Sequence, residues 1–464
     1  MPDFRFDTYL SPFTWRYGSD DMRRIWSETY KRLLWRKIWV ALAKAQNKEG
    51  LVSKEELDSL IAHQNEINIE QSNDLEKEIR HDLMAEIKVF ASQAKIGGGK
   101  IHLGATSMDI EDNADAVRQK EALEIIQKET RELLSTFAQK IETYKDTVCM
   151  AYTHLQPAEP TTLGYRFAFY AQDLLFDLQL LQFAMSMLKG KGLKGAVGTS
   201  ASYSTLMDNT KLQTMEKEIM QKLGIDPVII SNQTSPRKLE FFVSSALSSI
   251  AQTLYKFAFD LRLMQSPGFS EWQEPFGQKQ VGSSAMPFKK NPIKSEQICS
   301  LARLVFHLSE TSRDNAAHML LERTLDDSAN RRVYIPEMFL ALDEILRSAT
   351  AIVEKLVINK KQIAKNLSLH GPFAATEKLM MIAVKHGGNR QDIHEAIREN
   401  ALKAYDTMQE TDKNPLQQLL EEDSRITKCV PKNDIPKLLD PTSHIGLASE
   451  KCDEILAEIK KVLQ

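Results

Sequence analysis

Residues 282–296 combine small, flexible positions with groups that bind anions. They read Gly-Ser-Ser-Ala-Met-Pro-Phe-Lys-Lys-Asn-Pro-Ile-Lys-Ser-Glu, which places Ser283, Lys289 and Asn291 just ahead of a predicted helix. Free N–H groups and the dipole at a helix start favour anions, so the pattern fits a loop that holds a carboxylate. On physical grounds alone, a mobile surface loop with a solvated basic cluster fits equally well.

A histidine in a polar run is the second candidate for chemistry. His154 follows Thr153 and precedes Leu-Gln-Pro, just ahead of another expected helix start. Imidazole serves as a general acid or base near neutral pH, although a lone histidine is more often a structural residue. The neighbouring Thr and Gln side chains favour the catalytic interpretation.

Two further polar runs accompany these segments. Residues 105–113 read Ala-Thr-Ser-Met-Asp-Ile-Glu-Asp-Asn, where Thr106 and Asp109 fit the loose form of a capping box. Capping leaves Asp112 and Asn113 unexplained. Residues 322–332 read Glu-Arg-Thr-Leu-Asp-Asp-Ser-Ala-Asn-Arg-Arg, and their three arginines suit either bidentate binding of phosphate or carboxylate or an ordinary solvated helix face.

Other familiar motifs are absent or out of context. Residues 190–195 match G-x-G-x-x-G but follow a helical pattern rather than a strand, and residues 97–100 are not followed by the Ser or Thr of a P-loop. The sequence contains no H-E-x-x-H, and its four cysteines are far apart without a C-x-x-C pair. We therefore expect free thiols, no metal and no cofactor.

Long helices must position the candidate residues. Apolar side chains between residues 239 and 264 recur about every 3.6 positions, the period of an α-helix. Similar patterns cover residues 109–145, 161–188, 296–321 and 336–358, with Pro336 expected in a first helical turn. Polar or Gly-rich breaks separate these helices at residues 95–107, 190–204 and 266–292. Strands are expected to be scarce, with residues 228–230 as a short candidate.

Composition sets the class of protein. The chain has 464 residues with only 19 Gly and 16 Pro, and 60 Lys and Arg against 63 Asp and Glu. Few helix breakers favour long helices, and the lack of a basic excess gives no sign of nucleic acid or membrane as a partner. No signal peptide or membrane span is evident, so we expect a cytoplasmic protein. Three domains are predicted: an N-terminal helical domain at 1–106, a central long-helix bundle at 107–358 and a C-terminal helical domain at 359–464.

Apolar stripes on several helix faces also predict an oligomer.

Taken together, residues 106–113, 153–157 and 282–292 resemble three motifs of the aspartase/fumarase superfamily, in the expected order. The Arg80-His81-Asp82 triplet and residues 283–292 and 322–332 resemble its adenylosuccinate lyase family most closely. The resemblance implies an all-α, three-domain fold with a long central helical bundle, and a homotetramer whose active sites are shared between subunits.

The resemblance also implies a reaction in purine biosynthesis. Members of this family release fumarate by β-elimination from adenylosuccinate, giving AMP, and from the succinylated ribotide SAICAR, giving AICAR. Such substrates carry about four negative charges, counting a phosphate near −2. A chain of net charge −3 must therefore concentrate its cations locally. Two alternatives stay open: another fumarate-releasing lyase, such as an argininosuccinate lyase, or a non-catalytic structural relative.

Roles follow residue by residue from the same resemblance. Ser283 is expected to act as the base and His154 as the acid, with Glu296 orienting His154. Lys289 and Asn291 match positions that hold the substrate carboxylate, Lys289 also being a catalytic candidate. Thr106 and Ser107 are expected to bind the succinyl part. The remaining candidates match nucleotide and phosphate contacts, His81 also counting as catalytic: Arg16, Tyr17, Arg80, His81, Asp82, Gln233, Lys238, Arg323, Ser328 and Arg332.

One position departs from the family pattern. Gln297 stands where some relatives carry an arginine beside the substrate, so its contribution stays open. The other motif positions are intact, and Ser283, His154 and Lys289 weigh against a non-catalytic relative.

Overall fold

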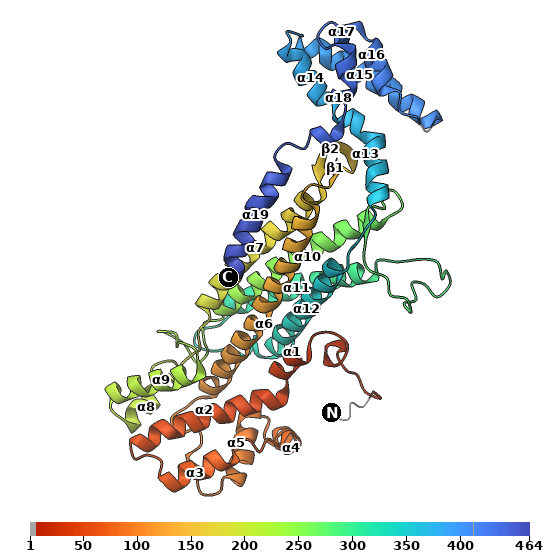
Figure 1. Ribbon diagram of the computed structural model, residues 1–464. Coiled ribbons are helices and arrows are strands. Elements are labelled where there is room, and N and C mark those ends of the chain that lie inside the picture. Colours follow the sequence, from red (N-terminus) through yellow and green to blue (C-terminus); the bar gives the residue numbers. More distant parts are fainter. Residues whose placement is uncertain (1–5, 412) are drawn as a thin grey trace. The chain divides into compact units, whose positions relative to one another are not determined.

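The computed structural model describes residues 6–411 and 413–464, and most of their regular structure is helical (Figure 1). The helices are α1 (Asp20–Ile25), α2 (Glu28–Lys48), α3 (Lys54–His63), α4 (Ile69–Ile79), α5 (Asp82–Gln93), α6 (Ser107–Tyr144), α7 (Leu163–Met187), α8 (Ala201–Leu206), α9 (Asn209–Leu223), α10 (Lys238–Gln265), α11 (Ile293–Ala317), α12 (Ser328–Glu354), α13 (Lys360–Ala374), α14 (Thr376–Lys385), α15 (Arg390–Glu410), α16 (Leu416–Glu422), α17 (Ser424–Thr427), α18 (Ile435–Leu438) and α19 (Ala448–Leu463). Short 3₁₀ turns occupy Pro12–Thr14, Gly98–Lys100, Lys432–Asp434 and Pro441–Ser443. The all-α expectation is confirmed.

Four of the five predicted long helices match the structure closely. Helices α6, α7, α10 and α11 begin and end within four residues of the predicted bounds. The predicted start of the fifth helix at Pro336 is wrong, because α12 begins at Ser328 and contains Pro336 in its interior. Tyr334 and Ile335 are buried just before the proline. Their packing favours helix on that side and outweighs the hydrogen bond that proline cannot donate.

The strands form two small antiparallel pairs, so strands are scarce as predicted, but the candidate strand at residues 228–230 was wrong. Strand β1 (Val148–Thr153) pairs with β2 (Gln156–Thr162), and β3 (Trp272–Gln273) pairs with β4 (Val357–Ile358). Residues 228–230 form no strand, since Ile229 and Ile230 are 89% and 76% exposed. His154 therefore lies in a hairpin turn rather than at a helix start.

One compact unit contains the chain up to Thr130 together with Asp177–Tyr255 and Cys299–Arg347. Its core includes Trp35 and Trp39 of α2 and Phe90 of α5, with the Trp39 and Phe90 ring centroids 6.3 Å apart in a stacked arrangement. Helix α9 contacts α2 and adds a second apolar cluster. Burial of these large side chains fixes the positions of α2, α5 and the first turns of α6.

The glycine-rich run at 190–195 fixes the start of α6. Buried Asp109 accepts hydrogen bonds from the Lys191 ammonium, from the backbone N–H groups of Lys194 and Gly195, and from the Tyr203 hydroxyl. One carboxylate oxygen also accepts the Thr106 N–H at 3.1 Å, which is one half of the predicted capping box. The glycine-rich run thus binds the Asp109 side chain of the same chain, which agrees with the conclusion that it is not a nucleotide-binding motif.

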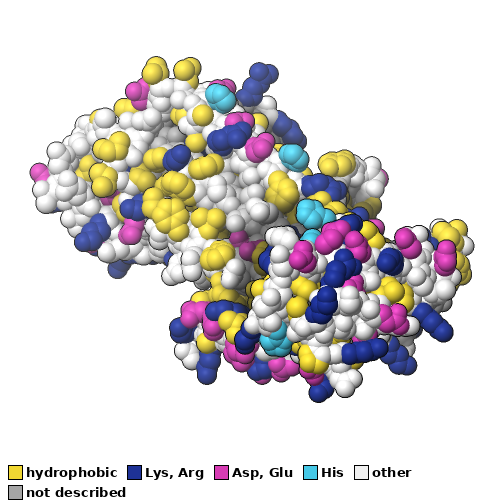
Figure 2. Space-filling model, turned by 90° about the horizontal axis from the view of Figure 1, so that it is seen from above, with side chains coloured by type: hydrophobic (Ala, Val, Ile, Leu, Met, Phe, Trp, Pro, Cys, Tyr) yellow, Lys and Arg dark blue, Asp and Glu magenta, His cyan; other side chains and the backbone are white. Residues whose placement is uncertain are grey.

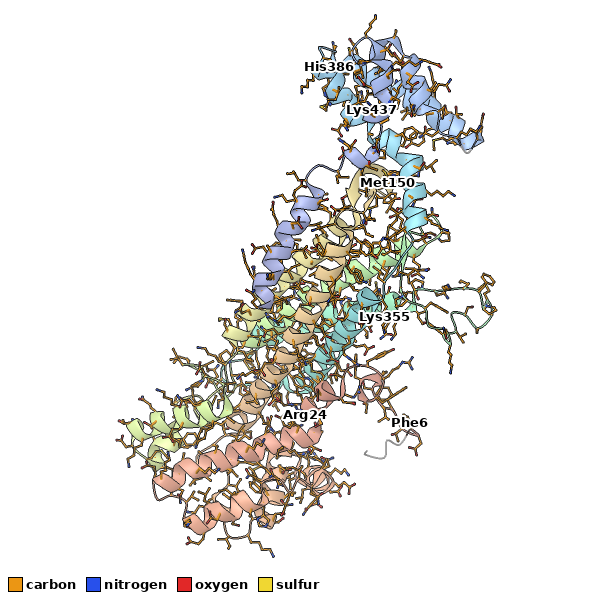
Figure 3. All side chains as sticks on the ribbon, in the orientation of Figure 1. Phe6, Arg24, Met150, Lys355, His386 and Lys437 are labelled. Carbon is orange, nitrogen blue, oxygen red and sulfur yellow. The ribbon has the colours of Figure 1, made fainter. Side chains whose placement is uncertain are left out.

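The second compact unit contains Arg131–Phe176, Lys256–Ile298 and Ser348–Gln464. Aromatic rings of Phe137 and Phe257 pack edge to face at 5.3 Å, and those of Phe167 and Trp272 do so at 5.4 Å. Within this unit, α13 packs against the β1–β2 hairpin, and α14 to α18 gather around a separate apolar core (Figure 1). Figure 3 labels Met150 on β1 and Lys437 on α18.

The four cysteines are free thiols, as expected. Charged side chains of both signs are interspersed on the face drawn in Figure 2. No helix among the described residues has the length and apolar character needed to cross a membrane. The three-domain division at 106 and 358 stays a prediction.

Candidate active site

A charged pocket in the first unit collects four of the predicted substrate-binding residues. Asp82, Arg323, Ser328 and Arg332 all line it. Its other lining residues come from α2, α6, α12 and the residues next to α2: Trp26, Glu28, Lys31, Trp35, Met108, Glu111, Asp115, Arg118, Arg331, Ile335 and Pro336. Residues from the polar runs at 105–113 and 322–332 and from the triplet at 80–82 therefore meet at one place.

The junction between α4 and α5 brings Asp82 into the pocket. Arg80 ends α4 in the left-handed backbone conformation, with φ of 56°. His81 then caps α5, because its Nδ1 accepts the Met84 N–H at 3.3 Å, which leaves Nε2 as the ring nitrogen that carries the proton in the neutral form. Asp82 begins the helix. Arg80, His81 and Asp82 thus occupy a sharp turn rather than one helix face.

An ion pair connects this junction to α12. The Arg332 Nη2 lies 2.7 Å from the Asp82 Oδ2. Burial raises the pKa of Asp82, but the charge and hydrogen bond of Arg332 more than offset this, so the pKa lies below its ordinary value. Asp82 is therefore a carboxylate at neutral pH, and it orients the guanidinium of Arg332.

A buried network positions Arg323. The Arg237 guanidinium binds Asp112 at 2.9 Å and Asp327 at 2.6 Å, and Asp327 also accepts from Arg323 at 2.9 Å. Asp112, which capping left unexplained, additionally accepts the Ser235 N–H at 2.7 Å. These bonds tie α6, the start of α10 and the segment before α12 together.

A second arginine of the polar run belongs to the same scaffold. Arg331 binds Glu240 at 2.6 Å and Asp115 at 3.2 Å, and the Tyr334 hydroxyl donates to Glu240 at 2.8 Å. Burial lowers the pKa of Arg331, but its carboxylate partners reverse this and hold it well above the ordinary value. Arg331 is therefore structural, while exposed Arg332 and half-buried Arg323 remain accessible.

The other predicted residues of this unit lie outside the pocket lining. The Gln233 N–H donates to the Glu322 carbonyl at 3.2 Å, next to Arg323. The Lys238 ammonium lies 4.9 Å from the Phe241 ring centroid on exposed surface. The Arg16 guanidinium lies over the neighbouring Trp15 and Tyr17 rings at 5.8 and 5.7 Å. Thr106 and Ser107 stand at the start of α6, immediately before the pocket residue Met108.

The serine segment lies in the second unit, between α10 and α11. The Ser283 hydroxyl accepts the Met286 N–H at 3.1 Å, and the Asn291 amide donates to the Gly282 carbonyl at 2.8 Å. A Cβ at Gly282 would meet the Lys289 carbonyl oxygen at 1.9 Å, so the two ends of this loop approach too closely for any other residue. The loop therefore has a defined internal geometry.

Two side chains anchor the ends of this loop. Gln265 accepts the Glu274 N–H at 3.0 Å and donates to the Lys290 carbonyl at 2.7 Å. The buried Glu274 carboxylate caps α11 by accepting the N–H groups of Lys294 and Ser295 at 3.2 and 3.0 Å and the Ser295 hydroxyl at 2.9 Å. Sequence analysis did not find Glu274, because it lies 20 and 21 residues before the two N–H groups that it caps, and so distant a cap leaves no local signal in the sequence.

The hairpin turn that carries His154 lies in the second unit. His154 and Leu155 both have left-handed backbone conformations, with φ of 52° and 62°, and His154 is exposed. Buried Glu271 anchors the base of the hairpin: it accepts from the Tyr152 hydroxyl at 3.0 Å and from Arg166 at 3.3 Å. Arg166 also donates to the carbonyl of Met150. These contacts fix the base of the hairpin, whereas His154 is exposed at its tip.

The predicted pairing of His154 with Glu296 does not occur within the chain. Among residues 6–411 and 413–464, neither side chain has a hydrogen bond or an ion pair with any other residue. Glu296 is exposed in the first turn of α11. Lys289 likewise has no carboxylate partner in the described chain, so its ammonium is available to a ligand.

Comparisons with known proteins identify the family. A family model described as "Lyase" matches residues 14–306, and one described as "Adenylosuccinate lyase C-terminus" matches residues 372–455. An adenylosuccinate lyase of Schistosoma mansoni is 37% identical, with 97% of this chain and 95% of the relative covered. The chain belongs to the adenylosuccinate lyase family. The enzyme of that name from Saccharomyces cerevisiae is 34% identical, with 100% and 97% covered, and that from Methanocaldococcus jannaschii is 36% identical, with 97% and 96% covered.

Similar solved structures confirm the predicted fold of this chain. A fumarate lyase from a Mesorhizobium species aligns with a TM-score of 0.85 at 23% identity, covering 97% of this chain and 99% of that one. A 3-carboxy-cis,cis-muconate lactonizing enzyme from Pseudomonas putida aligns with a TM-score of 0.86 at 22% identity, covering 96% and 98%. The predicted family and fold are confirmed, and the chain is a C–N lyase.

Proposed function

We propose that this lyase releases fumarate by β-elimination from adenylosuccinate, leaving AMP, and from SAICAR, leaving AICAR. The supporting observation is full-length similarity, at 33–37% identity, to curated proteins named adenylosuccinate lyase from animals, fungi and archaea. The residues that the resemblance assigns to this reaction are all present in the chain. Both products belong to purine biosynthesis.

In the proposed reaction, Ser283 removes the proton from the succinyl carbon that neighbours a carboxylate. A serine hydroxyl is a poor base unless its alkoxide is stabilised. The Met286 N–H already donates to the Ser283 oxygen, and Lys289, three residues after Met286, has no carboxylate partner among the described residues. Both features favour the alkoxide, and Lys289 and Asn291 then hold the carboxylate beside the developing carbanion.

His154 is proposed to protonate the leaving nitrogen as the C–N bond breaks. The exposed imidazole at a hairpin tip has no partner among the described residues, which suits a group that meets its substrate and Glu296 only in an assembled site. Thr106 and Ser107 would bind the succinyl group. His81, with its proton on Nε2, is a second proton donor next to the phosphate pocket.

The pocket in the first unit is proposed to bind the nucleotide. Arg332 and Arg323 offer guanidinium groups suited to bidentate phosphate binding, and Ser328 adds a hydroxyl. Arg80, Asp82, Gln233, Lys238, Arg16 and Tyr17 complete the proposed nucleotide contacts. No metal or cofactor has a role in this scheme.

A homotetramer is the proposed assembly, with sites shared between subunits and a cytoplasmic location. Helix α7 supports it, because large apolar side chains at helical spacing form one exposed stripe along it. Tyr165, Phe169, Phe176 and Phe183 are 44%, 50%, 58% and 49% exposed. Such a stripe is costly to leave in water and is typical of an interface between long helices.

Purified protein and adenylosuccinate test the proposal directly. Fumarate release, followed by the absorbance change of the purine or by a coupled fumarate assay, is the expected result. Argininosuccinate, malate and aspartate serve as competing substrates. No fumarate from adenylosuccinate, or faster release from argininosuccinate, would reject the assignment and favour a sibling lyase or a non-catalytic relative.

A further inference from the structure

Glu111 is a carboxyl group of the pocket for which sequence analysis gave no role. It lies on α6, one helical turn after Ser107, and lines the pocket together with Asp82, Ser328 and Arg332. Its side chain is half-buried, and no hydrogen bond or ion pair joins it to another described residue. Such a carboxyl group is unexpected in a pocket that we propose to bind a phosphate.

The cations around Glu111 are already paired with other carboxylates. Arg332 on α12 pairs with Asp82 on α5, and Arg118 on α6 pairs with Asp115 at 3.0 Å. The remaining charged groups of the pocket are likewise paired: Lys31 with Glu28 on α2, Arg331 with Asp115 and Glu240, and Arg323 with Asp327. Glu111 is thus the surplus acid of the pocket, and Asp82, Asp112 and Asp115 disfavour a further negative charge there.

The electrostatics agree with this geometry. Burial and the neighbouring Asp82 charge raise the pKa of Glu111 to about 8, with Arg332 opposing them. A carboxyl group with such a pKa is mostly the neutral acid at pH 7. The ionised form would add a negative charge next to the guanidinium that we propose as a phosphate ligand.

We propose that Glu111 is a specificity-determining residue of the nucleotide pocket, and that the pocket accepts a phosphate dianion only while this carboxyl group is protonated. The inference rests on the proposed nucleotide site. The neutral acid adds no negative charge beyond the carboxylates of Asp82 and Asp327, which already pair with Arg332 and Arg323. The carboxylate form of Glu111 would repel the phosphate and compete for Arg332. Binding of phosphate in turn favours the protonated form, so substrate binding above neutral pH takes up a proton.

The expected consequence is a pH dependence of KM. If only the protonated form binds, the apparent affinity scales with the protonated fraction. With a pKa of about 8, that fraction falls about tenfold between pH 7 and pH 9. The KM for adenylosuccinate should therefore rise about tenfold over this range, and so should the Kd for AMP.

Glu111→Gln tests the proposal, since it keeps the shape of the side chain but cannot ionise. The ratio of KM at pH 9 to KM at pH 7 is expected to fall from about ten to below two. Glu111→Asp, which retains a carboxyl group, should keep a ratio well above two. Glu124→Gln on the exposed face of the same helix, where Glu124 lies outside the pocket, is the matched control and should keep the wild-type ratio.

AMP binding separates this inference from the proposed function. Calorimetric titration with AMP at pH 8, repeated in buffers of different ionisation enthalpy, should show proton uptake by the wild type and little by Glu111→Gln. Equal KM ratios in the wild type and Glu111→Gln, or equal proton uptake, would overturn the role of Glu111 while leaving the lyase activity in place. Absence of both fumarate release and AMP binding in the wild type would instead reject the nucleotide site itself and the inference with it.

Discussion

Replacing Arg237 by Met would test whether the buried network holds the pocket together. The Arg237 guanidinium is 1% exposed and binds Asp112 and Asp327, whose side chains are 0% and 1% exposed. Methionine fills similar space without a charge, so both carboxylates would lose their main partner while buried. Asp327 holds Arg323, and the substitution should therefore disturb the pocket as well as stability.

The size of the effect follows from these contacts. Removing one partner of a buried ion pair costs about 3–5 kcal/mol. Asp112 retains Arg331 at 3.7 Å and Asp327 retains Arg323 at 2.9 Å, which places the expected loss at the lower end. The unfolding entropy of a chain of 464 residues is roughly 1 kcal/mol/K, so a loss of about 3 kcal/mol lowers Tm by about 3 °C.

The loss should also depend on pH. Burial raises the pKa of Asp112, but the charges of Arg237 and Arg331 more than offset this and hold it below the ordinary value. Such a group stabilises the wild type above its unfolded pKa, and this contribution disappears as pH falls through the folded pKa. In the variant the contribution is absent, so the Tm difference should stay nearly constant from pH 7 down to about 4 and narrow only as pH is lowered further.

Differential scanning calorimetry measures the Tm of Arg237→Met against the wild type and one matched control variant. Arg398→Met removes an exposed pair with Glu395, in which the side chains are 50% and 47% exposed. Its expected cost is only about 0.3–0.5 kcal/mol. If Arg237→Met at pH 7 unfolds within about 1 °C of both the wild type and Arg398→Met, the network does not carry the stability argued here.

Three further predictions concern the reaction and the assembly. Ser283→Ala and His154→Ala should each remove most of kcat without changing the size-exclusion profile, and mixing the two inactive proteins should restore partial activity. Near-normal turnover in either variant would refute the role of that residue, and a mixture without activity would count against shared sites. Glu274→Gln should cost about 1–3 kcal/mol at the α11 cap and lower kcat, and wild-type kinetics in it would contradict its anchoring of the loop. Phe176→Glu with Phe183→Glu should yield smaller particles in sedimentation velocity, so an unchanged sedimentation coefficient would speak against an interface on α7.

Much of the helical architecture follows from local sequence, because apolar periodicity is a property of each segment by itself. The gap between α10 and α11 was predicted almost to the residue for this reason. The β1–β2 hairpin was not predicted, because Pro157 and Pro160 in β2 usually interrupt a strand. A pair of two strands tolerates them, since prolines at its edge need not donate an N–H. Pro336 led to the wrong start for α12, because proline is typical of a first helical turn but also occurs inside a helix that is held by packing.

The candidate site shows the same division between local and tertiary information. The family resemblance pointed to Asp82 and residue type alone pointed to the polar run at 322–332, and the structure brings both into one pocket. It did not tell Arg331 from Arg332, because their difference in burial depends on Glu240 and Asp115 from other helices. Glu111 stood in a recognised motif run, but its isolation among paired charges is visible only in three dimensions.

The hairpin tip has a consequence for attempts to make this protein more heat-resistant. Two successive left-handed positions form the kind of turn for which Asn-Gly is the preferred pair. His154 and Leu155 occupy these positions instead, at an expected strain of about 1–3 kcal/mol per residue. A design rule that ranks substitutions by turn propensity would thus choose Asn-Gly first, and would delete the imidazole that we propose as the acid.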